Sequence, residues 1–246
     1  MLSRRSFLQS SGGAFAASLV AGVTMPAAVT PHQPDHIILG CRDIDEGIDY
    51  AEGLSGYRAE IGGSHPGRGT RNALLKLGER SYLEILAPDP EQPELTWHKE
   101  ILTLTEPLLI GWAEPGKNID QYAASLRAKG IACIGPISGT RANPKGEVFR
   151  WRTVMLEDDK AGILPFYIEW ASDSPHPASD APGGCLFIRM SRAGQIIMTP
   201  SPGPGYQRMI FSDKPAQLHV TIAGRYGEFQ LISRAVPSEA WLKPHR

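Results

Sequence analysis

The chain has 246 residues, 41% of them hydrophobic, and its 25 basic and 26 acidic side chains give a formal net charge of −1. This length and composition are typical of a globular protein with a substantial core. The near-neutral charge, without a polybasic block, argues against nucleic acid or an anionic membrane surface as a partner. No GxSxG, GxGxxG or HExxH pattern occurs, so neither a serine hydrolase nor a nucleotide cofactor is supported.

The N-terminus carries the pattern of an export signal. Arg4 and Arg5 precede an apolar pair, a weakly hydrophobic run over residues 12–24, and a small-residue segment at 26–28. This predicts a twin-arginine (Tat) signal peptide over residues 1–30, recognised by the Tat translocation machinery. The run is shorter than the about 20 apolar residues of a membrane span, so no stable span is expected after processing. We expect a periplasmic or extracellular protein; the alternative is an amphipathic or disordered N-terminus with a chance Arg-Arg pair.

The next part of the chain predicts a strand, a helix and three further strands. The strands are expected at residues 36–41, 57–61, 73–77 and 81–86, and the helix at 45–54. A glycine-rich loop, GGSHPGRGTRN, separates the second and third of these strands. Two prolines, Pro88 and Pro90, end the last one because proline cannot donate to a strand ladder. A connector follows, with helix expected around residues 97–104.

The same order of elements is then predicted again. A strand at 108–113 and a helix at 118–129 precede strands at 132–137, 149–156 and 164–170. The polar stretch GTRANPKGEVFR is expected to lengthen the hairpin between the first two of these three strands. Since DHIILGC also aligns with PLLIGWA, the chain is interpreted as a duplication of one βαβββ unit. The predicted fold class is α+β.

Each unit ends in an apolar strand that contains one glutamate. Glu84 lies in RSYLEILA and Glu169 lies in LPFYIEWA. A carboxylate with such neighbours is costly to bury unless it is paired, protonated or bound to a cation. Both glutamates are therefore candidate functional residues.

Beyond residue 185 the pattern weakens to short alternating strands. Residues 186–246 are interpreted as a β-rich C-terminal extension packed on the barrel or as a partial third module. The three cysteines, Cys41, Cys133 and Cys185, are widely spaced, which does not favour a zinc or iron–sulfur site. We expect them to be buried as small apolar residues, with one disulfide and a free thiol as the alternative.

The segment DHIILGCRDID…HPGRGTRNALLKLGERSYLEILAPDP, together with LPFYIEWASDSPHPASDAPGG, resembles the glyoxalase-like domain proteins of the vicinal oxygen chelate (VOC) superfamily. The resemblance implies a domain over residues 31–185, with modules at about 35–90 and 107–172. It also implies that the two βαβββ modules form a half-open barrel whose cavity often holds a divalent metal.

Carried over to this chain, the resemblance implies a metal set of His36, Glu84 and Glu169, with the two glutamates as catalytic groups. The fourth position of the family falls on Leu108 or a neighbour, where this chain has no ligand. Iron, manganese, nickel or zinc would suit the remaining three. The alternative is that His36 forms hydrogen bonds with Glu84 or Glu169 and no ion is needed.

Six further residues are candidates for substrate binding. HPGRGT offers the backbone amides of Gly67 and Gly69 to a carboxylate or enolate, and Trp170 adjoins Glu169. The alternative for this loop is a tight, exposed hairpin with Arg68 in solvent, and for His176 an ordering role in its own loop. The candidates are His65, Arg68, Thr70, Asn72, Trp170 and His176.

Two functions remain open at this point. One is a metal-dependent lyase, isomerase or dioxygenase acting on a small oxygen-bearing substrate. The other is a metal-free protein that binds or sequesters a small molecule in the same cavity. The number of subunits is also open, and a homodimer is one option.

Overall fold

The computed structural model describes residues 33–157, 162–192, 195–198 and 216–236. The predicted Tat signal peptide lies outside these residues. No helix in the described part of the chain is long and apolar enough to cross a membrane.

The first module has the predicted order of elements. It comprises β1 (His36–Gly40), α1 (Ile44–Ser55), β2 (Glu60–His65), β3 (Thr70–Gly78) and β4 (Ser81–Pro88). Helix α1 begins where the Asp43 carboxylate accepts hydrogen bonds from the backbone of Asp45 and Glu46. It ends at Gly56, whose φ of 75° suits a residue without a Cβ atom. The strands β2 and β3 extend into the predicted loop, so only residues 66–69 form a turn.

The second module repeats this order after a short 3₁₀ helix, η1 (Lys99–Thr103). It comprises β5 (Leu108–Pro115), α2 (Ile119–Ala128), β6 (Cys133–Ala142), β7 (Val148–Leu156) and β8 (Phe166–Trp170). The two long strands β6 and β7 pair from Cys133 to Ala142, so the lengthened hairpin is confirmed. The α+β class with two βαβββ units is confirmed as well.

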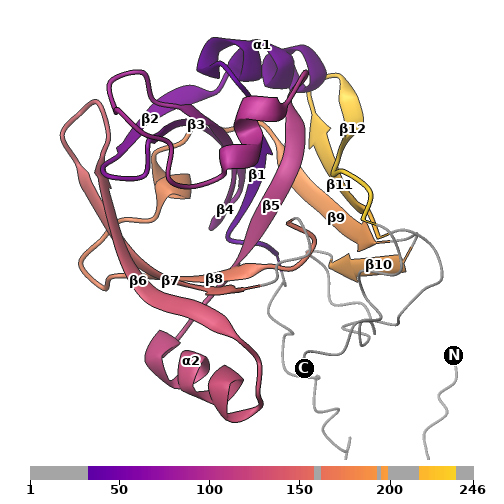
Figure 1. The fold of residues 1–246 in the computed structure, drawn as a ribbon. Helices are drawn as coiled ribbons and strands as arrows, with labels where there is room; N and C mark the ends of the chain where they lie inside the picture. Colours follow the sequence, from indigo (N-terminus) through magenta and orange to yellow (C-terminus); the bar gives the residue numbers. More distant parts are fainter. Residues whose placement is uncertain (1–32, 158–161, 193–194, 199–215, 237–246) are drawn as a thin grey trace, which may run out of the picture. The chain divides into compact units, whose positions relative to one another are not determined.

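All eight strands of the two modules form one strongly curled sheet (Figure 1). Its order is β2-β3-β4-β1-β5-β8-β7-β6. Within each module the first and last strands run parallel, and β1 and β5 join the modules in an antiparallel pair. The predicted half-open barrel is therefore present, with β1, β4, β5 and β8 along its middle.

The two outer strands of this sheet, β2 and β6, approach each other at one end. The Arg141 guanidinium on β6 donates a hydrogen bond to the Gly62 carbonyl on β2. Next to it, Gly63 has a φ of 134°, and a Cβ atom there would overlap the Ala142 carbonyl oxygen. Glycine is therefore required at position 63 for the backbones to lie this close.

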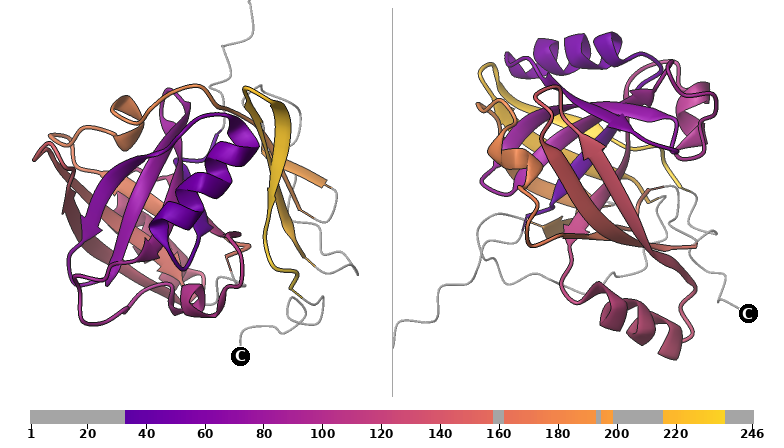
Figure 2. Two further views of the ribbon diagram at one scale, coloured as in Figure 1. Left: turned by 90° about the horizontal axis from the view of Figure 1, so that it is seen from above. Right: turned by 90° about the vertical axis from the view of Figure 1, so that its left-hand side faces the viewer.

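A second sheet covers the outer face of the first module (Figure 2). After the short helix η2 (Pro177–Ser179), the chain forms β9 (Leu186–Arg192), β10 (Gln195–Met198), β11 (Leu218–Gly224) and β12 (Gly227–Ile232). Their order is β10-β9-β11-β12. The described residues after 185 therefore form a β-rich extension.

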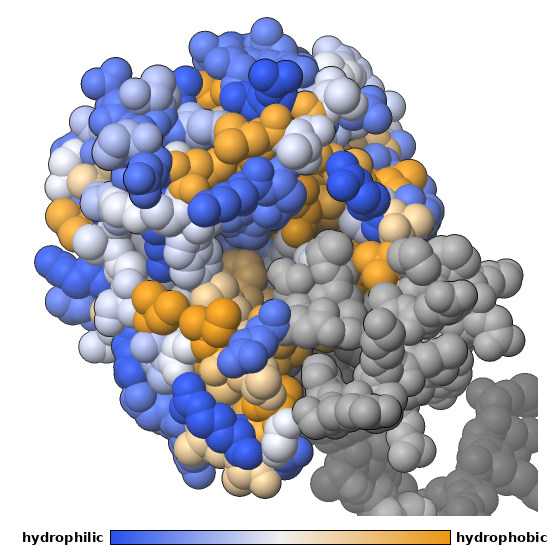
Figure 3. All heavy atoms as spheres, in the orientation of Figure 1, coloured by the Kyte–Doolittle hydropathy of each residue, from blue (hydrophilic) through white to orange (hydrophobic). Residues whose placement is uncertain are grey.

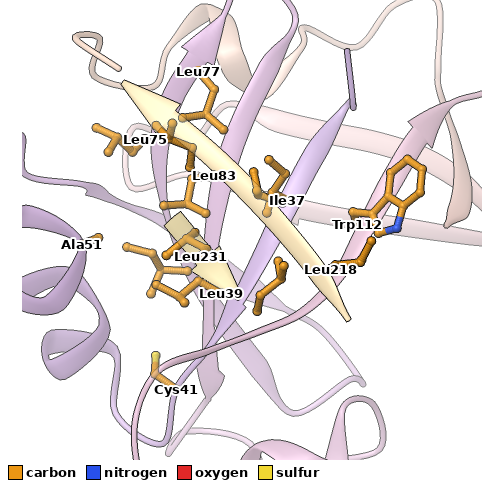
Figure 4. Packing of buried hydrophobic residues seen from close by; sticks show 14 of the residues in the cluster. Ile37, Leu39, Cys41, Ala51, Leu75, Leu77, Leu83, Trp112, Leu218 and Leu231 are labelled. Carbon is orange, nitrogen blue, oxygen red and sulfur yellow. The ribbon is translucent and has the colours of Figure 1, made fainter. Parts of the chain in front are cut away.

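Strands β1 and β4 are buried on both faces, which explains their almost continuous apolar sequence. Ile37 and Leu39 point away from the barrel and pack with Leu83, α1 and the C-terminal sheet (Figure 4). The alternate residues, His36 and Ile38, point into the barrel. One short strand thus serves the main core and the interior of the barrel.

The three cysteines are buried and free, as expected. Burial raises the pKa of Cys41 to about 12, and the nearby Glu46 and Asp43 carboxylates contribute to the same shift. Cys41 therefore packs as a small apolar side chain in the core shared with α1 and the C-terminal sheet.

Replacing Gly63 with Ala should lower the free energy of unfolding by about 1–3 kcal/mol, because the new methyl group meets a backbone carbonyl at a strained φ. Gly53, inside helix α1, is the matched control because a methyl group added there would have no neighbouring atom within 4 Å. Gly53→Ala should be neutral or raise stability by about 0.5–1 kcal/mol. Chemical denaturation measures both; equal effects of the two changes would contradict the close approach of β2 and β6.

Candidate functional site

The interior of the half-barrel is a cavity of about 520 Å³. This volume lies within the range of small-molecule sites. Figure 3 shows hydrophobic surface beside the hollow on this face of the molecule. Strands of both modules line it, and the ionisable lining residues are His36, His65, Arg68, Tyr82, Glu84, His98, Glu100, Arg141 and Glu157.

Glu84 lies in the polar part of this cavity and is 7% exposed. Its Oε1 atom accepts a hydrogen bond of 2.6 Å from the Asn72 side-chain amide. The Nε2 atoms of His36 and His65 lie 3.5 Å and 3.6 Å from its two oxygens. The buried carboxylate thus has polar partners, and they offset the free-energy cost of removing it from water.

Burial raises the pKa of Glu84, but the opposing effects of His36, His65 and Asn72 are larger in sum, and the net shift is downward. The carboxylate is therefore ionised at neutral pH. It is a charged proton acceptor inside a largely apolar cavity.

Asp35, just before β1, holds His36 in place. Its carboxylate accepts from His36 Nδ1 at 2.8 Å, from Trp170 Nε1 at 2.9 Å and from His176 Nε2 at 3.1 Å. Burial by itself would raise the pKa of Asp35, but hydrogen bonds from His176 and His36 lower it to about 2. An ionised Asp35 carboxylate can only accept hydrogen bonds, so the Nδ1 atom of His36 carries the proton that is donated to it. The Nε2 atom of His36 faces Glu84.

His65 is held as a neutral imidazole. Desolvation lowers its pKa to about 4, although Glu84 opposes the shift. Its Nδ1 atom lies 2.9 Å from the Thr70 hydroxyl, and Nε2 lies 3.3 Å from the Asn72 amide nitrogen. The amide can only donate, so Nε2 accepts and Nδ1 carries the proton.

The HPGRGT turn presents its arginine, and not its amides, to the cavity. The amides of Gly67 and Gly69 donate to the Gln92 side chain at 2.9 Å and 3.2 Å. The expectation that these amides bind a ligand is thus corrected, because the connector after β4 already uses them. Arg68 lines the cavity with its guanidinium carbon 4.2 Å from the centre of the Trp97 ring.

Glu169 lies away from His36 and Glu84, so the structure does not bring the expected metal set together. Its carboxylate accepts from the backbone N–H groups of Asn118 at 2.7 Å and Ile119 at 3.4 Å. These are the amides of the N-cap residue Asn118, whose own side chain makes no capping bond, and of the first residue of helix α2. Glu169 therefore caps α2 and complements its dipole.

The separation of the two glutamates follows from strand register. On β4, Tyr82, Glu84 and Leu86 line the cavity, and on β8 the lining residues are Phe166, Ile168 and Trp170. Ile168 is thus the inward counterpart of Glu84. Aligning glutamate with glutamate shifts β8 by one residue, which turns the side chain to the other face.

The remaining donors do not fit the expected metal centre. On β5 the lining residues are Ile110, Gly111 and Trp112, none of which has a side-chain ligand suited to these metals. Within residues 33–157, 162–192 and 216–236, no group of three or more His, Cys, Asp and Glu side chains is arranged to hold a metal ion. In this geometry His36 and Glu84 face each other, while Glu169 bonds the start of α2 and is not part of the same cluster.

Of the six predicted substrate-binding residues, five line the cavity: His65, Arg68, Thr70, Asn72 and Trp170. His176 lies behind the lining, where it bonds Asp35 and accepts from the Ala178 amide. Sequence reasoning missed Asp35, Trp97, Arg141 and Trp151. Of these, only Asp35 stood beside a candidate residue in the sequence, and its place before an apolar strand was a usable signal.

Glu169→Gln should lower the free energy of unfolding by about 0.5–2 kcal/mol, because a neutral amide caps α2 less well. Ligand binding in the cavity should be unchanged, since Glu169 does not line it. Glu79→Gln, in the exposed β3–β4 turn, is the matched control and should have little effect. A loss of ligand binding in Glu169→Gln at unchanged stability would contradict the capping role.

Stability should fall as the pH drops from about 6.5 toward 4. Over this range the unfolded chain binds a proton at His65 while the folded protein does not, so protons favour unfolding. His65→Gln should flatten this part of the profile relative to the wild-type protein. Denaturant unfolding at several pH values provides the measurement, and an unchanged slope in His65→Gln would contradict a neutral, buried His65.

The comparisons with known proteins agree with this fold. No curated protein matches the chain. A hypothetical protein from Staphylococcus aureus has a similar structure, with 15% identity, a TM-score of 0.51, and coverage of 82% of this chain and 86% of that one. Methylmalonyl-CoA epimerase of Streptomyces coelicolor, in complex with 2-nitronate-propionyl-CoA, is 22% identical, with a TM-score of 0.44 over 59% of this chain and 99% of the epimerase.

The epimerase of Mycobacterium tuberculosis is 20% identical, with a TM-score of 0.43 over 60% of this chain and 94% of that one. The glyoxalase-like domain family matches residues 35–193, which include the whole curled sheet and the cavity. The chain therefore belongs to the glyoxalase-like domain family.

Proposed function

We propose that this protein is an enzyme that moves a proton on a small oxygen-bearing molecule, with Glu84 as the general base. The observation that carries the proposal is an ionised, buried carboxylate in a cavity of small-molecule size. A base must be deprotonated and accessible to its substrate; Glu84 has a lowered pKa and lines the cavity, which supports this role. Desolvation by a bound ligand would strengthen it further as a base.

His36 is the second group in this proposal. Its Nδ1–H is fixed by Asp35, so Nε2 faces both the cavity and Glu84. In this orientation Nε2 can carry a proton to or from the substrate, while Asp35 stabilises the positive charge on the ring. Glu84 and His36 would act as a base and acid pair on neighbouring atoms of the substrate, which suits an isomerase or a lyase.

A bound metal is not used in this mechanism. His36 and Glu84 could supply two ligands, but Glu169 caps α2 and does not reach them. Metals are common in the family, where they supply Lewis acid chemistry to substrate oxygens. Here the positive groups beside Glu84 are side chains of the protein, Arg68 and Arg141 among them.

A second candidate function is a binding protein without catalysis. The hydrogen bond of 2.6 Å from Asn72 favours it, because this bond occupies one oxygen of Glu84 and weakens it as a base. The same cavity would then hold a small molecule unchanged.

Export is part of the proposal. It is supported by the Arg4–Arg5 pair and the weakly hydrophobic run that follows it. An exported protein of this kind would act on molecules in the periplasm or outside the cell.

The test is proton exchange with solvent. Purified protein is incubated in D₂O with a panel of oxo acids, hydroxy ketones and acyl thioesters, and exchange next to the carbonyl group is followed by proton NMR. At least one compound should exchange, and Glu84→Gln should slow this exchange by about 10²–10⁴-fold, since it removes the base and keeps the shape.

Glu79→Gln is the matched control and should exchange at the wild-type rate. Wild-type exchange in Glu84→Gln would refute the role of this carboxylate. If compounds of the panel bind but none exchanges, the second candidate function, a binding protein without catalysis, would be supported. Exchange that a chelator abolishes, together with one equivalent of metal removed by His36→Ala, would show that a metal acts at the site.

A further inference from the structure

We propose that the ligand of this cavity is a carboxylate with an apolar body, its carboxylate bound by Arg68 and assisted by Arg141. This assignment rests on the cavity being the functional site and names the chemical class of its ligand. It follows from two buried guanidinium nitrogens without an acceptor at one end of the cavity, where positive charges outnumber the one carboxylate, and from the apolar lining of the other end.

Arg68 is placed to bind an anion. Its guanidinium carbon lies 4.2 Å from the centre of the Trp97 ring and 5.6 Å from that of Trp151. Its Nη2 atom is buried and has no hydrogen-bond partner among the described residues. A buried guanidinium N–H group without an acceptor is costly, and a planar carboxylate would supply the acceptor.

The turn that carries Arg68 is held in place from several sides. The Arg68 amide donates to the His65 carbonyl, and the Arg68 carbonyl accepts from Thr96. Gln92 fixes the amides of Gly67 and Gly69 on either side of it. A guanidinium on a fixed turn, stacked on indole rings, loses little freedom when it binds an anion.

Arg141 adds a second positive charge at the same end. It is 3% exposed, stacks over Phe149 at 4.4 Å, and has an Nη2 atom that is buried without a partner in the described part of the chain. Its other terminal nitrogen bonds the Gly62 carbonyl.

Among the lining residues, one carboxylate, Glu84, faces these two guanidinium groups, and its bond from the neutral Asn72 amide leaves its charge in place. Glu100 is paired with His98 at 2.8 Å. Glu157, the other acidic lining residue, is exposed and follows β7 at the end opposite to Trp151. The end near Arg68 and Arg141 therefore has a net need for negative charge.

The register of β6 and β7 places the apolar lining at the other end. Ile134 pairs with Met155 there, whereas Gly139 pairs with Trp151 and Arg141 with Phe149. The polarity of the lining thus changes along the two strands. Ile38, Leu86, Ile110 and Phe166 form an apolar cluster that also lines the cavity. A ligand that spans both ends has one charged group and an apolar body.

The experiment measures binding of octanoate, butanoate and the neutral octanamide at pH 7. Quenching of the cavity tryptophans (Trp97, Trp112, Trp151 and Trp170) reports binding, and calorimetry gives the Kd. Octanoate should bind at least tenfold more tightly than octanamide. It should also bind more tightly than butanoate, by about fourfold per added CH₂ group.

Arg68→Gln should weaken octanoate binding at least tenfold and leave octanamide binding unchanged. Arg58→Gln, which removes an exposed charge from outside the cavity, is the matched control and should change neither. Thermal unfolding checks that both variants fold. Equal Kd values for octanoate and octanamide, no binding of octanoate, or an unchanged Kd in Arg68→Gln would overturn the proposal.

The outcome is separable from that of the proton-transfer test. Carboxylate binding that needs Arg68, without exchange that needs Glu84, would keep this assignment and refute the enzyme. Exchange that needs Glu84 on neutral compounds, unaffected in Arg68→Gln, would keep the enzyme and refute this assignment.

Discussion

The carboxylate of Asp35 is the interaction on which the site depends. It accepts hydrogen bonds from His36 on β1, Trp170 on β8 and His176 in the segment after β8. Its backbone also bonds β5 and β4, through Ala113 and Tyr82. One buried anion therefore connects both modules where they meet. Three side-chain N–H groups donate to this carboxylate, and these hydrogen bonds stabilise its buried negative charge.

From this point the two faces of the sheet take separate tasks. Inward residues of β1 and β4 bring His36 and Glu84 to the cavity, while outward residues such as Ile37 and Leu83 form the main core. The same alternation separates the two glutamates. Glu84 faces the cavity, and Glu169 faces the start of α2 and caps that helix. Similar sequence surroundings thus serve two roles, and only the register distinguishes them.

Much of the architecture could be predicted because it depends on local patterns. Strand alternation and the spacing of apolar residues along the two helices are signals within a few residues of one another. The duplication followed from comparing two such patterns. The cavity residues of the HPGRGT segment were also found, because an unusual local composition marks them.

The rest depended on contacts between distant parts of the chain. Arg141 reaches the cavity because β6 meets β2, and no local pattern around GTRAN indicates that. Trp97 enters through the connector, which also supplies Gln92 to the turn. The face of Glu169 could not be decided from IEW, because either register leaves apolar neighbours on both sides.

The C-terminal sheet has a consequence for how the chain folds. Ile37 and Leu39 share one core with Leu218 and Val220, which lie about 180 residues later in the sequence. Contacts of such separation form late, because a long loop must close before they are made. During synthesis the outer apolar face of the first module would therefore stay exposed to solvent until β11 has left the ribosome. A fragment that ends after the second module would retain the cavity residues, but β1, which carries His36, would lose the C-terminal sheet that covers its outer face.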